Sequence, residues 1–182
     1  MRKVFIFFGI LNDEDIEWLA SNGILRLTAA GDTLIQEGRS VDAIFLVIDG
    51  AFQVTVGSRD VAKLQAGEIV GEMSFVDARP PSASVKALEK SSVLSVPRVK
   101  LAEKLERDIA FSARFYRALA VFLAERLRAS VSQLGYGTEK PSAEQIEERD
   151  ELDVNILENL SLASNRFDQL QRRLRSASST HA

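Results

Sequence analysis

Glycine-containing breaks divide the stretch from Ile24 to Pro97 into short runs of β-branched and apolar residues. The runs are Ile24–Leu27, Thr33–Gln36, Ala43–Ile48, Phe52–Val56, Val61–Gln65, Ser84–Leu88 and Val93–Val96. Short strands that recur about every ten residues with turn residues between them are typical of an all-β sandwich or barrel. No helical pattern separates the runs, which argues against a parallel α/β sheet, because its strands need crossover helices.

On both sides of residues 24–97, the apolar residues recur at helical spacing instead. Residues 1–22 predict an N-terminal helical segment, in which Asn12 or Asp13 caps a short helix and the preceding phenylalanine-rich run packs under the β domain. Residues 98–135 predict a hinge helix and then a long helix over 109–134. The long helix carries an apolar stripe of Tyr116, Ala120, Leu123, Leu127, Ser130 and Leu134. That stripe must be buried on the chain's own β unit or on a second copy, and we expect a homodimer.

A linker over 136–142 precedes one more predicted helix at 143–177, and residues 178–182 are expected to be a disordered tail. The seam of the terminal helix consists of Ile156, Leu160, Ala163, Phe167, Leu170 and Leu174. Its 4-3-4-3-4 spacing is coiled-coil-like and indicates pairing between chains through 152–174 or packing on the helix's own domain. The helix is acidic at its start and basic at its end, which suits the helix macrodipole; a small basic patch for an anionic partner is the alternative.

Composition excludes several kinds of chemistry. The sequence has no cysteine, its one histidine is His181 beside the end, and its net charge is −3. We therefore expect no disulfide, no metal site, no enzyme activity and no broad nucleic-acid-binding surface. The apolar run Val4–Leu11 is far shorter than the roughly 20 residues of a membrane span, and acidic residues follow it where a signal peptide would have its cleavage site. We expect a cytoplasmic location.

The segment 67–85 carries the most functional information. Gly67 and Gly71 permit tight turns and a close approach of backbone to a ligand. Residues 72–75 can form one helical turn whose first N–H groups suit a phosphate, although helix N-termini occur in every protein. The doublet Pro80-Pro81 stiffens the return into the next strand.

This segment resembles the phosphate-binding cassette of cyclic nucleotide-binding domains, as in the catabolite activator protein and the regulatory subunit of cyclic-AMP-dependent protein kinase. Residues 31–38, 44–50 and 95–97 are similar to other parts of the same family's pattern, so the resemblance covers about residues 13–135. It implies a mainly β fold with flanking helices. The expected core is an antiparallel β-roll (double-stranded jelly-roll-like), followed by long C-terminal helices.

The resemblance also implies ligand-binding roles for individual residues. Glu72 matches the family's acceptor of the ribose 2′-hydroxyl. Backbone groups that approach the ribose and cyclic phosphate fall at Gly71, Met73 and Ser74, donors to the phosphate oxygens at Ser82 and Ala83, and a polar contact to the base at Ser130. No cofactor is implied, and the expected ligand is cyclic AMP or another cyclic nucleotide.

One departure from the family pattern concerns the ligand directly. Pro81 occupies the position of the arginine that pairs with the cyclic phosphate. Proline has no charge and no backbone N–H, so it cannot replace that arginine. Arg79 lies two residues earlier and is a candidate substitute, but a residue before a proline is held extended.

Three functions follow from these observations. The first is a regulatory sensor that couples a small anionic ligand in the β-roll to a dimeric helix. The second is a degenerate, non-nucleotide-binding dimeric scaffold with an unknown protein partner. The third, a DNA-binding transcriptional regulator, is disfavoured because residues 143–176 contain neither the glycine nor the proline that a tight turn between two recognition helices would favour.

Overall fold

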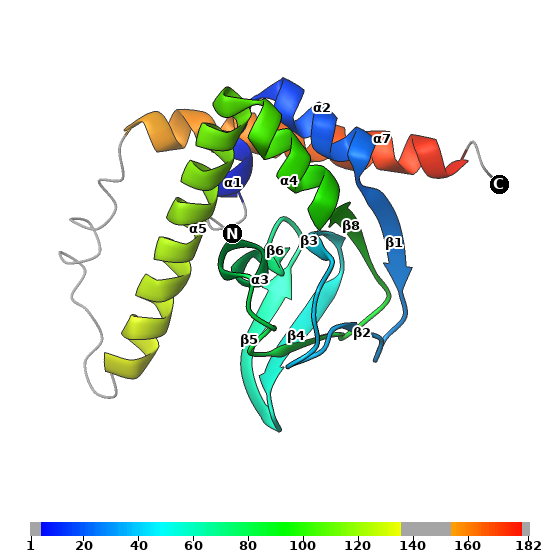
Figure 1. Ribbon diagram of the computed structural model, residues 1–182, viewed down its shortest axis with the longest axis vertical. Helices are drawn as coiled ribbons and strands as arrows, with labels where there is room; N and C mark the ends of the chain where they lie inside the picture. Colours follow the sequence, from blue (N-terminus) through cyan, green and yellow to red (C-terminus); the bar gives the residue numbers. More distant parts are fainter. Residues whose placement is uncertain (1–4, 136–153, 180–182) are drawn as a thin grey trace.

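The computed structural model of the chain describes residues 5–135 and 154–179. Two four-stranded antiparallel sheets form its centre, and helices cover one side (Figure 1). The strands are β1 (Ile24–Thr28), β2 (Thr33–Ile35), β3 (Ala43–Asp49), β4 (Ala51–Val56), β5 (Arg59–Gln65), β6 (Ile69–Val70), β7 (Ser84–Ala87) and β8 (Ser91–Pro97). The helices are α1 (Phe5–Ile10), α2 (Asp13–Asn22), α3 (Glu72–Asp77), α4 (Arg98–Arg107), α5 (Ile109–Gly135) and α7 (Val154–Ser179).

The strand order confirms the predicted antiparallel β-roll. One sheet runs β1-β8-β3-β6 and the other β2-β7-β4-β5. All seven strand ranges expected from the sequence are strands, with ends that shift by one or two residues. The chain turns from β3 to β4 at Gly50, where φ is 86° and an added Cβ would lie 2.1 Å from the Ser91 hydroxyl oxygen. Glycine is therefore required here by both its backbone conformation and its surroundings. The Asp49-Gly50 sequence between two strands predicts a hairpin, and this prediction is wrong: β3 and β4 belong to different sheets, so the turn carries the chain from one sheet to the other.

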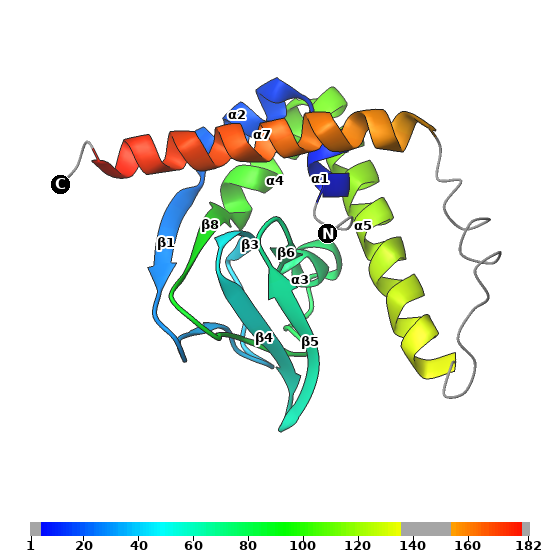
Figure 2. The same ribbon diagram turned by 180° about the vertical axis from the view of Figure 1, so that it is seen from behind.

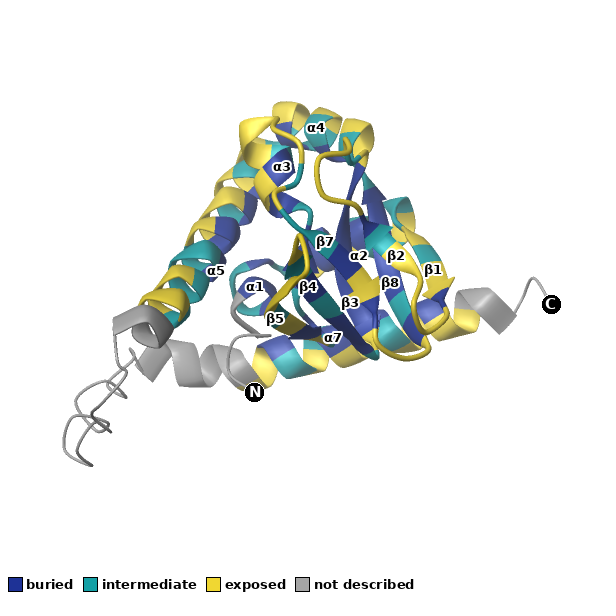
Figure 3. Ribbon diagram, turned by 90° about the horizontal axis from the view of Figure 1, so that it is seen from below, coloured by how far each residue is buried: buried dark blue, intermediate teal, exposed yellow. Residues whose placement is uncertain are grey.

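Two apolar cores lie on either side of the first sheet. Alternate residues of β3, including Val47, face the second sheet and pack with Phe52 and Val93, each with no exposed surface. The intervening β3 residues, such as Leu46, pack with the helices. Because β3 is buried on both faces, its sequence is a continuous apolar run instead of an alternating one. Figure 3 shows this burial across the sheets and helices.

The terminal helix α7 packs on the N-terminal helices of the same chain. It lies across one side of the molecule beside α1 and α2, as the reverse view shows (Figure 2). Four residues of the predicted seam are buried there: Ala163, Phe167, Leu170 and Leu174. The side chains of Ile156 and Leu160 lie outside the described residues, as do the linker 136–142 and the first part of the predicted helix.

This packing gives the described part of the seam a partner within the chain. The phenylalanine-rich segment supplies the partner for α7, since Phe8 contacts Phe167 at a ring-centroid distance of 5.2 Å. A polar contact joins α7 to the sheet, where Gln171 Nε2 donates to the Ile48 carbonyl at 2.7 Å. The described seam is thus covered within the chain. Among residues 161–176, whose side chains the structure describes, no seam residue is left exposed for the expected pairing between chains through 152–174.

Among the described residues, no helix combines the length and the hydropathy of a membrane span.

Candidate functional site

The cassette-like segment folds as the short helix α3 between two left-handed residues. Gly71 precedes α3 with φ of 89°, and Ala78 ends it with φ of 58°. A Cβ added at Gly71 would lie 3.0 Å from the Ala43 carbonyl oxygen and 3.6 Å from Ile44 Cα. Only glycine combines this backbone conformation with so close an approach to β3. The first residues of α3 are therefore held tightly against the sheet.

Glu72 is the first residue of α3 and is buried, with 2% of its surface exposed. Its Oε1 accepts a hydrogen bond from Arg126 Nη1 of α5 at 2.8 Å, which makes an ion pair across 54 residues of sequence. Burial raises the pKa of Glu72, while Arg126 and the residue's own backbone N–H act in the opposite direction and offset part of that rise. A buried, ion-paired carboxylate beside a glycine turn is typical of a functional site, although structural ion pairs share this property.

Two further contacts attach α3 to the helical layer. Arg98, the first residue of α4, donates from Nη1 to the Ser74 carbonyl oxygen at 3.0 Å. Its guanidinium also lies 5.7 Å from the ring centroid of Phe75. Phe75 also meets Phe115 of α5 edge-on, with 6.2 Å between ring centroids. Consequently α3 is bonded to both α4 and α5, and it cannot move without changing those contacts.

The return from α3 to β7 is held by the turn between β2 and β3. The Gly38 N–H donates to the Pro81 carbonyl at 2.9 Å. The Glu37 N–H donates to Ser84 Oγ at 3.0 Å. These bonds place the proline-rich return against a second glycine turn, at φ of 76° for Gly38.

The predicted site residues divide into two groups by position. Gly71, Glu72, Met73 and Ser74 are consecutive at the start of α3, with Met73 exposed and Ser74 buried. Ser82 and Ala83 follow in the return, the first exposed and the second half-buried. Arg79 is exposed, and its backbone N–H donates to Asp77 Oδ1 at 3.0 Å.

Ser130 lies on the exposed surface of α5, where its Oγ donates to the Arg126 carbonyl oxygen at 3.0 Å. The structure thus places Ser130 one turn beyond the residue that contacts α3. Sequence reasoning missed Arg126 and Arg98 as parts of this site. Arg126 lies four residues before Ser130, so the two share one face of the predicted helix. This spacing is the sequence signal that could have identified Arg126.

Within residues 5–135 and 154–179, no group of three or more His, Cys, Asp or Glu side chains is placed to hold a metal ion. A groove of about 390 Å³ borders the cassette helix on its helical side. It is lined by Phe75, Arg98, Ala102, Leu105, Glu106, Ser112 and Tyr116. The groove is thus bordered by residues of α3, α4 and α5.

Replacing Arg126 by alanine is expected to lower the free energy of unfolding by about 2–3 kcal/mol at neutral pH, because the buried Glu72 loses its counter-charge. The raised pKa of Glu72 means that its contribution to stability is present at low pH and is lost as pH rises above the ordinary value of 4.5 and through the folded-state value. Without Arg126 that pKa rises further, so the deficit should grow between pH 5 and pH 8. Urea unfolding at several pH values measures it.

Arg128→Ala provides the matched control on the same helix, since the side chain of Arg128 is 72% exposed and pairs with the more superficial Glu125. Its effect should stay within about 0.5 kcal/mol at every pH. A deficit in Arg126→Ala that does not change with pH would contradict the role assigned to the Glu72 carboxylate.

Comparison with known proteins identifies the central part of the chain. Residues 25–108 match the family model of the cyclic nucleotide-binding domain. The Drosophila melanogaster potassium voltage-gated channel protein eag is 30% identical over 125 residues, which cover 66% of this chain and 11% of that protein. The Pycsar effector protein XpPycTIR of Xanthomonas perforans is 32% identical over 111 residues, covering 60% of this chain and 37% of the effector. The chain therefore matches less than two thirds of the length of these relatives.

Solved structures show the same fold. A cyclic nucleotide-binding domain from Methylobacillus flagellatus has a TM-score of 0.65 and 25% identity, covering 72% of this chain and 76% of that one. The catabolite activator protein of Thermus thermophilus has a TM-score of 0.60 and 23% identity, covering 97% of this chain and 88% of that one. Both likenesses agree with the strand order and the flanking helices described above.

Proposed function

Since residues 25–108 belong to the cyclic nucleotide-binding domain family, we propose that this chain is a regulatory module that binds a cyclic nucleotide beside α3. The observation that carries the proposal is Glu72, buried at the first turn of α3 and paired with Arg126 of α5. Cyclic AMP is the ligand with which to begin. Its ribose 2′-hydroxyl would donate to the Glu72 carboxylate, and its phosphate would lie against the return at Ser82 and Ala83.

Ligand binding at this position would act on α5 through the contacts of α3. Glu72 and Phe75 are on α3, and each contacts a residue of α5, Arg126 and Phe115 respectively. A ligand whose hydroxyl group donates a hydrogen bond to Glu72 competes with Arg126 for the same carboxylate. Binding therefore changes the ion pair between α3 and α5. Binding shifts a conformational equilibrium only if the ligand interacts differently with the two states, and competition for Glu72 supplies such a difference.

A dimeric scaffold that binds no nucleotide is the second candidate function. Pro81 favours it, because this position offers neither a charge nor a backbone N–H to a phosphate. The pairing of Glu72 with Arg126 favours it as well, because the ion pair needs no ligand to satisfy the carboxylate. The scaffold would then transmit no small-molecule signal.

Thermal unfolding in the presence of candidate ligands separates the two functions. Cyclic AMP, cyclic GMP and cyclic dinucleotides are compared with the open nucleoside 5′-monophosphates as controls. A ligand at about 100 times its Kd stabilises the folded state by about 2.7 kcal/mol, which raises the Tm by about 5–10 °C for a chain of this size. A rise in Tm with a cyclic nucleotide, but not with the open 5′-monophosphates, supports the sensor function. Equal or absent shifts with every compound support the scaffold.

We also propose that α5 pairs with a second copy of the chain. Part of the stripe predicted from the sequence is exposed on this helix, with Tyr116 47% and Leu127 65% accessible, whereas Leu123 is half-buried against the helical core. Val131, which is not a member of that stripe, is also exposed, at 58%. The side chain of Leu134 lies outside the described residues. The exposed stripe residues Tyr116, Ala120 and Leu127 are spaced by four and seven residues, as along the seam of a two-stranded coiled coil, so an identical helix fits this face.

Analytical ultracentrifugation tests this pairing. The wild-type chain is expected to sediment as a dimer and Leu127→Glu as a monomer, because a charge at the seam opposes the contact between the two apolar stripes. Arg117→Glu, an exposed change on the same helix, should leave the dimer intact. A wild-type monomer at about 100 µM, far above the Kd of a stable dimer, would rule the pairing out.

A further inference from the structure

Aromatic rings form a continuous series from the C-terminal helix α7 to the cassette helix α3. Phe167 of α7 meets Phe8 of α1 at 5.2 Å between ring centroids, and Phe8 meets Phe7 at 6.0 Å. Phe7 meets Phe115 of α5 at 5.7 Å, and Phe115 meets Phe75 of α3 at 6.2 Å. All four distances fall within the range of attractive ring pairs. We refer to these five residues as the aromatic series.

The middle of the series is a helix that depends on its neighbours. The six-residue helix α1 is far shorter than the roughly 12–15 residues that an isolated helix needs to be even marginally stable. Consecutive residues of a helix point in different directions, so Phe7 and Phe8 face different partners. Phe7 packs on α5 and Phe8 on α7, and both are buried. The position of α1 is therefore set from both sides.

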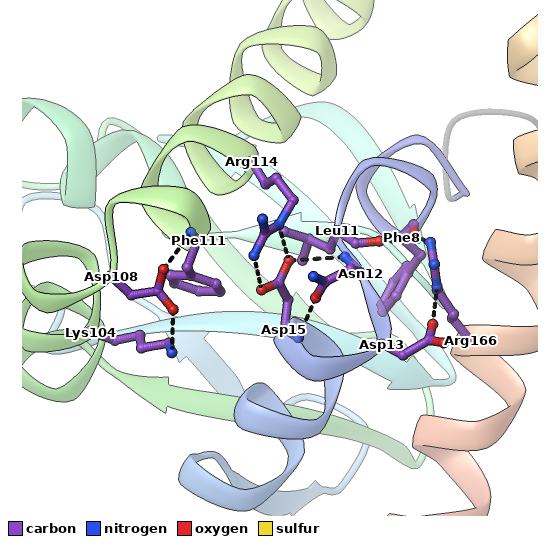
Figure 4. A network of polar contacts seen from close by, with 10 residues as sticks. All are labelled: Phe8, Leu11, Asn12, Asp13, Asp15, Lys104, Asp108, Phe111, Arg114 and Arg166. Atoms are coloured by element: carbon purple, nitrogen blue, oxygen red, sulfur yellow. Dashed lines mark hydrogen bonds and ion pairs between the residues drawn. The ribbon is translucent and has the colours of Figure 1, made fainter.

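A polar network joins the same three elements at the turn between α1 and α2 (Figure 4). Arg166 of α7 donates from Nη1 to the carbonyl oxygens of Phe8 and Leu11, at 3.1 and 2.7 Å. From α5, Arg114 makes two hydrogen bonds to the buried Asp15, at 2.6 and 2.8 Å. Asp15 in turn accepts from the Asn12 backbone N–H at 2.9 Å, which closes the capping box of α2. Residues 7–15 thus contact α5 on one side and α7 on the other.

We propose that residues 7–15 couple α3 and α5 to α7, and that α7 is the output element of the domain. The proposal rests on the proposed function in treating α3 as the helix that senses the ligand. A displacement of α3 changes the packing of Phe75 on Phe115. Phe7 and Phe8 pass this change on to the surface on which Phe167 packs. Close-packed interiors transmit such displacements because they contain few voids to absorb them.

The coupling must operate in both directions. If the state of α3 changes the docking free energy of α7, then undocking α7 changes the free energy of that state of α3 by the same amount. A perturbation placed on α7 can therefore be read at α3 without any ligand. The experiment below uses the full chain in this way.

The perturbation is Phe167→Ala, read by hydrogen exchange in peptides that cover residues 71–78. In the wild-type background, this change is expected to speed exchange in α3 by about tenfold. In a Phe7→Leu background, which interrupts the series at α1, the same change should alter exchange in α3 by less than about twofold. Phe52→Leu is the matched background, because Phe52 is equally buried but packs between the two sheets. It should leave the tenfold effect intact.

Peptides of β4, remote from the series, report general loss of stability. Exchange in α3 that remains within twofold of wild type while α7 exchange accelerates would overturn the proposal. So would an equal acceleration in α3 and β4, because that pattern signals global unfolding. If Phe167→Ala fails to fold, Arg166→Gln removes the bonds from α7 to Phe8 and Leu11 and is read by the same criteria. The experiment uses no ligand, so its result is independent of nucleotide binding. The coupling can be absent in a chain that binds a nucleotide, and it can be present in a chain that does not.

Discussion

Pro81→Arg is expected to tighten binding of cyclic AMP by about 30-fold to several thousand-fold, the equivalent of about 2–5 kcal/mol for a desolvated charge pair. Pro81 is half-buried in the return after α3, beside the two residues expected to donate to the phosphate. Its carbonyl accepts from the Gly38 N–H at 2.9 Å, and arginine keeps this carbonyl. The substitution therefore adds a guanidinium without removing the bond that positions the loop. Isothermal titration calorimetry of both proteins measures the ratio.

Pro80→Arg provides the control for a nonspecific effect of charge. Pro80 is adjacent and exposed, so an arginine there should change the affinity by no more than a few-fold, as expected for a solvent-screened charge. Equal gains at both positions would indicate attraction by net charge alone. No gain at position 81 would show that the pocket has diverged from the family at more than this one residue.

Phe115→Ala should lower the free energy of unfolding by about 3–5 kcal/mol, among the larger losses seen for core aromatic residues. Phe115 has no exposed surface and contacts the rings of Phe7, Phe75 and Phe111, which belong to α1, α3 and α5. Removing its ring leaves a cavity that three elements would have to move to fill. Urea unfolding at 25 °C measures the loss.

The neighbouring Tyr116 provides the comparison, because it is 47% exposed on the outer face of the same helix. In conditions where the chain is monomeric, Tyr116→Ala should cost less than about 1 kcal/mol. Similar losses at positions 115 and 116 would contradict the account in which Phe115 is the centre of the helical core. They would point instead to helix propensity as the common cause.

The β-roll could be predicted from the sequence because its information is local. Turn glycines and apolar runs of four to six residues identify strands wherever they occur, and each predicted run is a strand. The two-residue strand β6 was missed, since Ile69-Val70 is too short to show any period. Gly71 was correctly predicted to permit a tight turn, and its positive φ angle explains why glycine stands there.

The partners of the helices could not be predicted, because periodicity shows which face is apolar and not what covers it. The seam of α7 looks like a coiled coil in isolation, yet Phe167 packs on Phe8, more than 150 residues earlier. Neither segment contains a signal for the other. Their association follows from the shared need to bury phenylalanine and leucine side chains on the same side of the sheet.

The candidate site was predicted in part. The segment at residues 67–85 was identified from its glycines, its prolines and its resemblance to the family's cassette. The partner of Glu72 is Arg126 on α5, and nothing in the sequence pairs these two residues. Sequence spacing gives no distance between α3 and α5, so this ion pair required the structure. The role of Arg79 remains a prediction, since it is exposed in the loop before Pro80.

Calorimetric titration of the full chain with cyclic AMP, together with Glu72→Gln and the control Glu125→Gln, tests the central claim most directly. The account predicts saturable binding of one nucleotide per chain, which Glu72→Gln weakens by about tenfold or more through loss of the charged acceptor. Glu125→Gln alters an ion pair on the same helix as Arg126, away from α3, and should bind like the wild type. The absence of heat at millimolar nucleotide, or equal affinity in all three proteins, would contradict a cyclic-AMP site at α3.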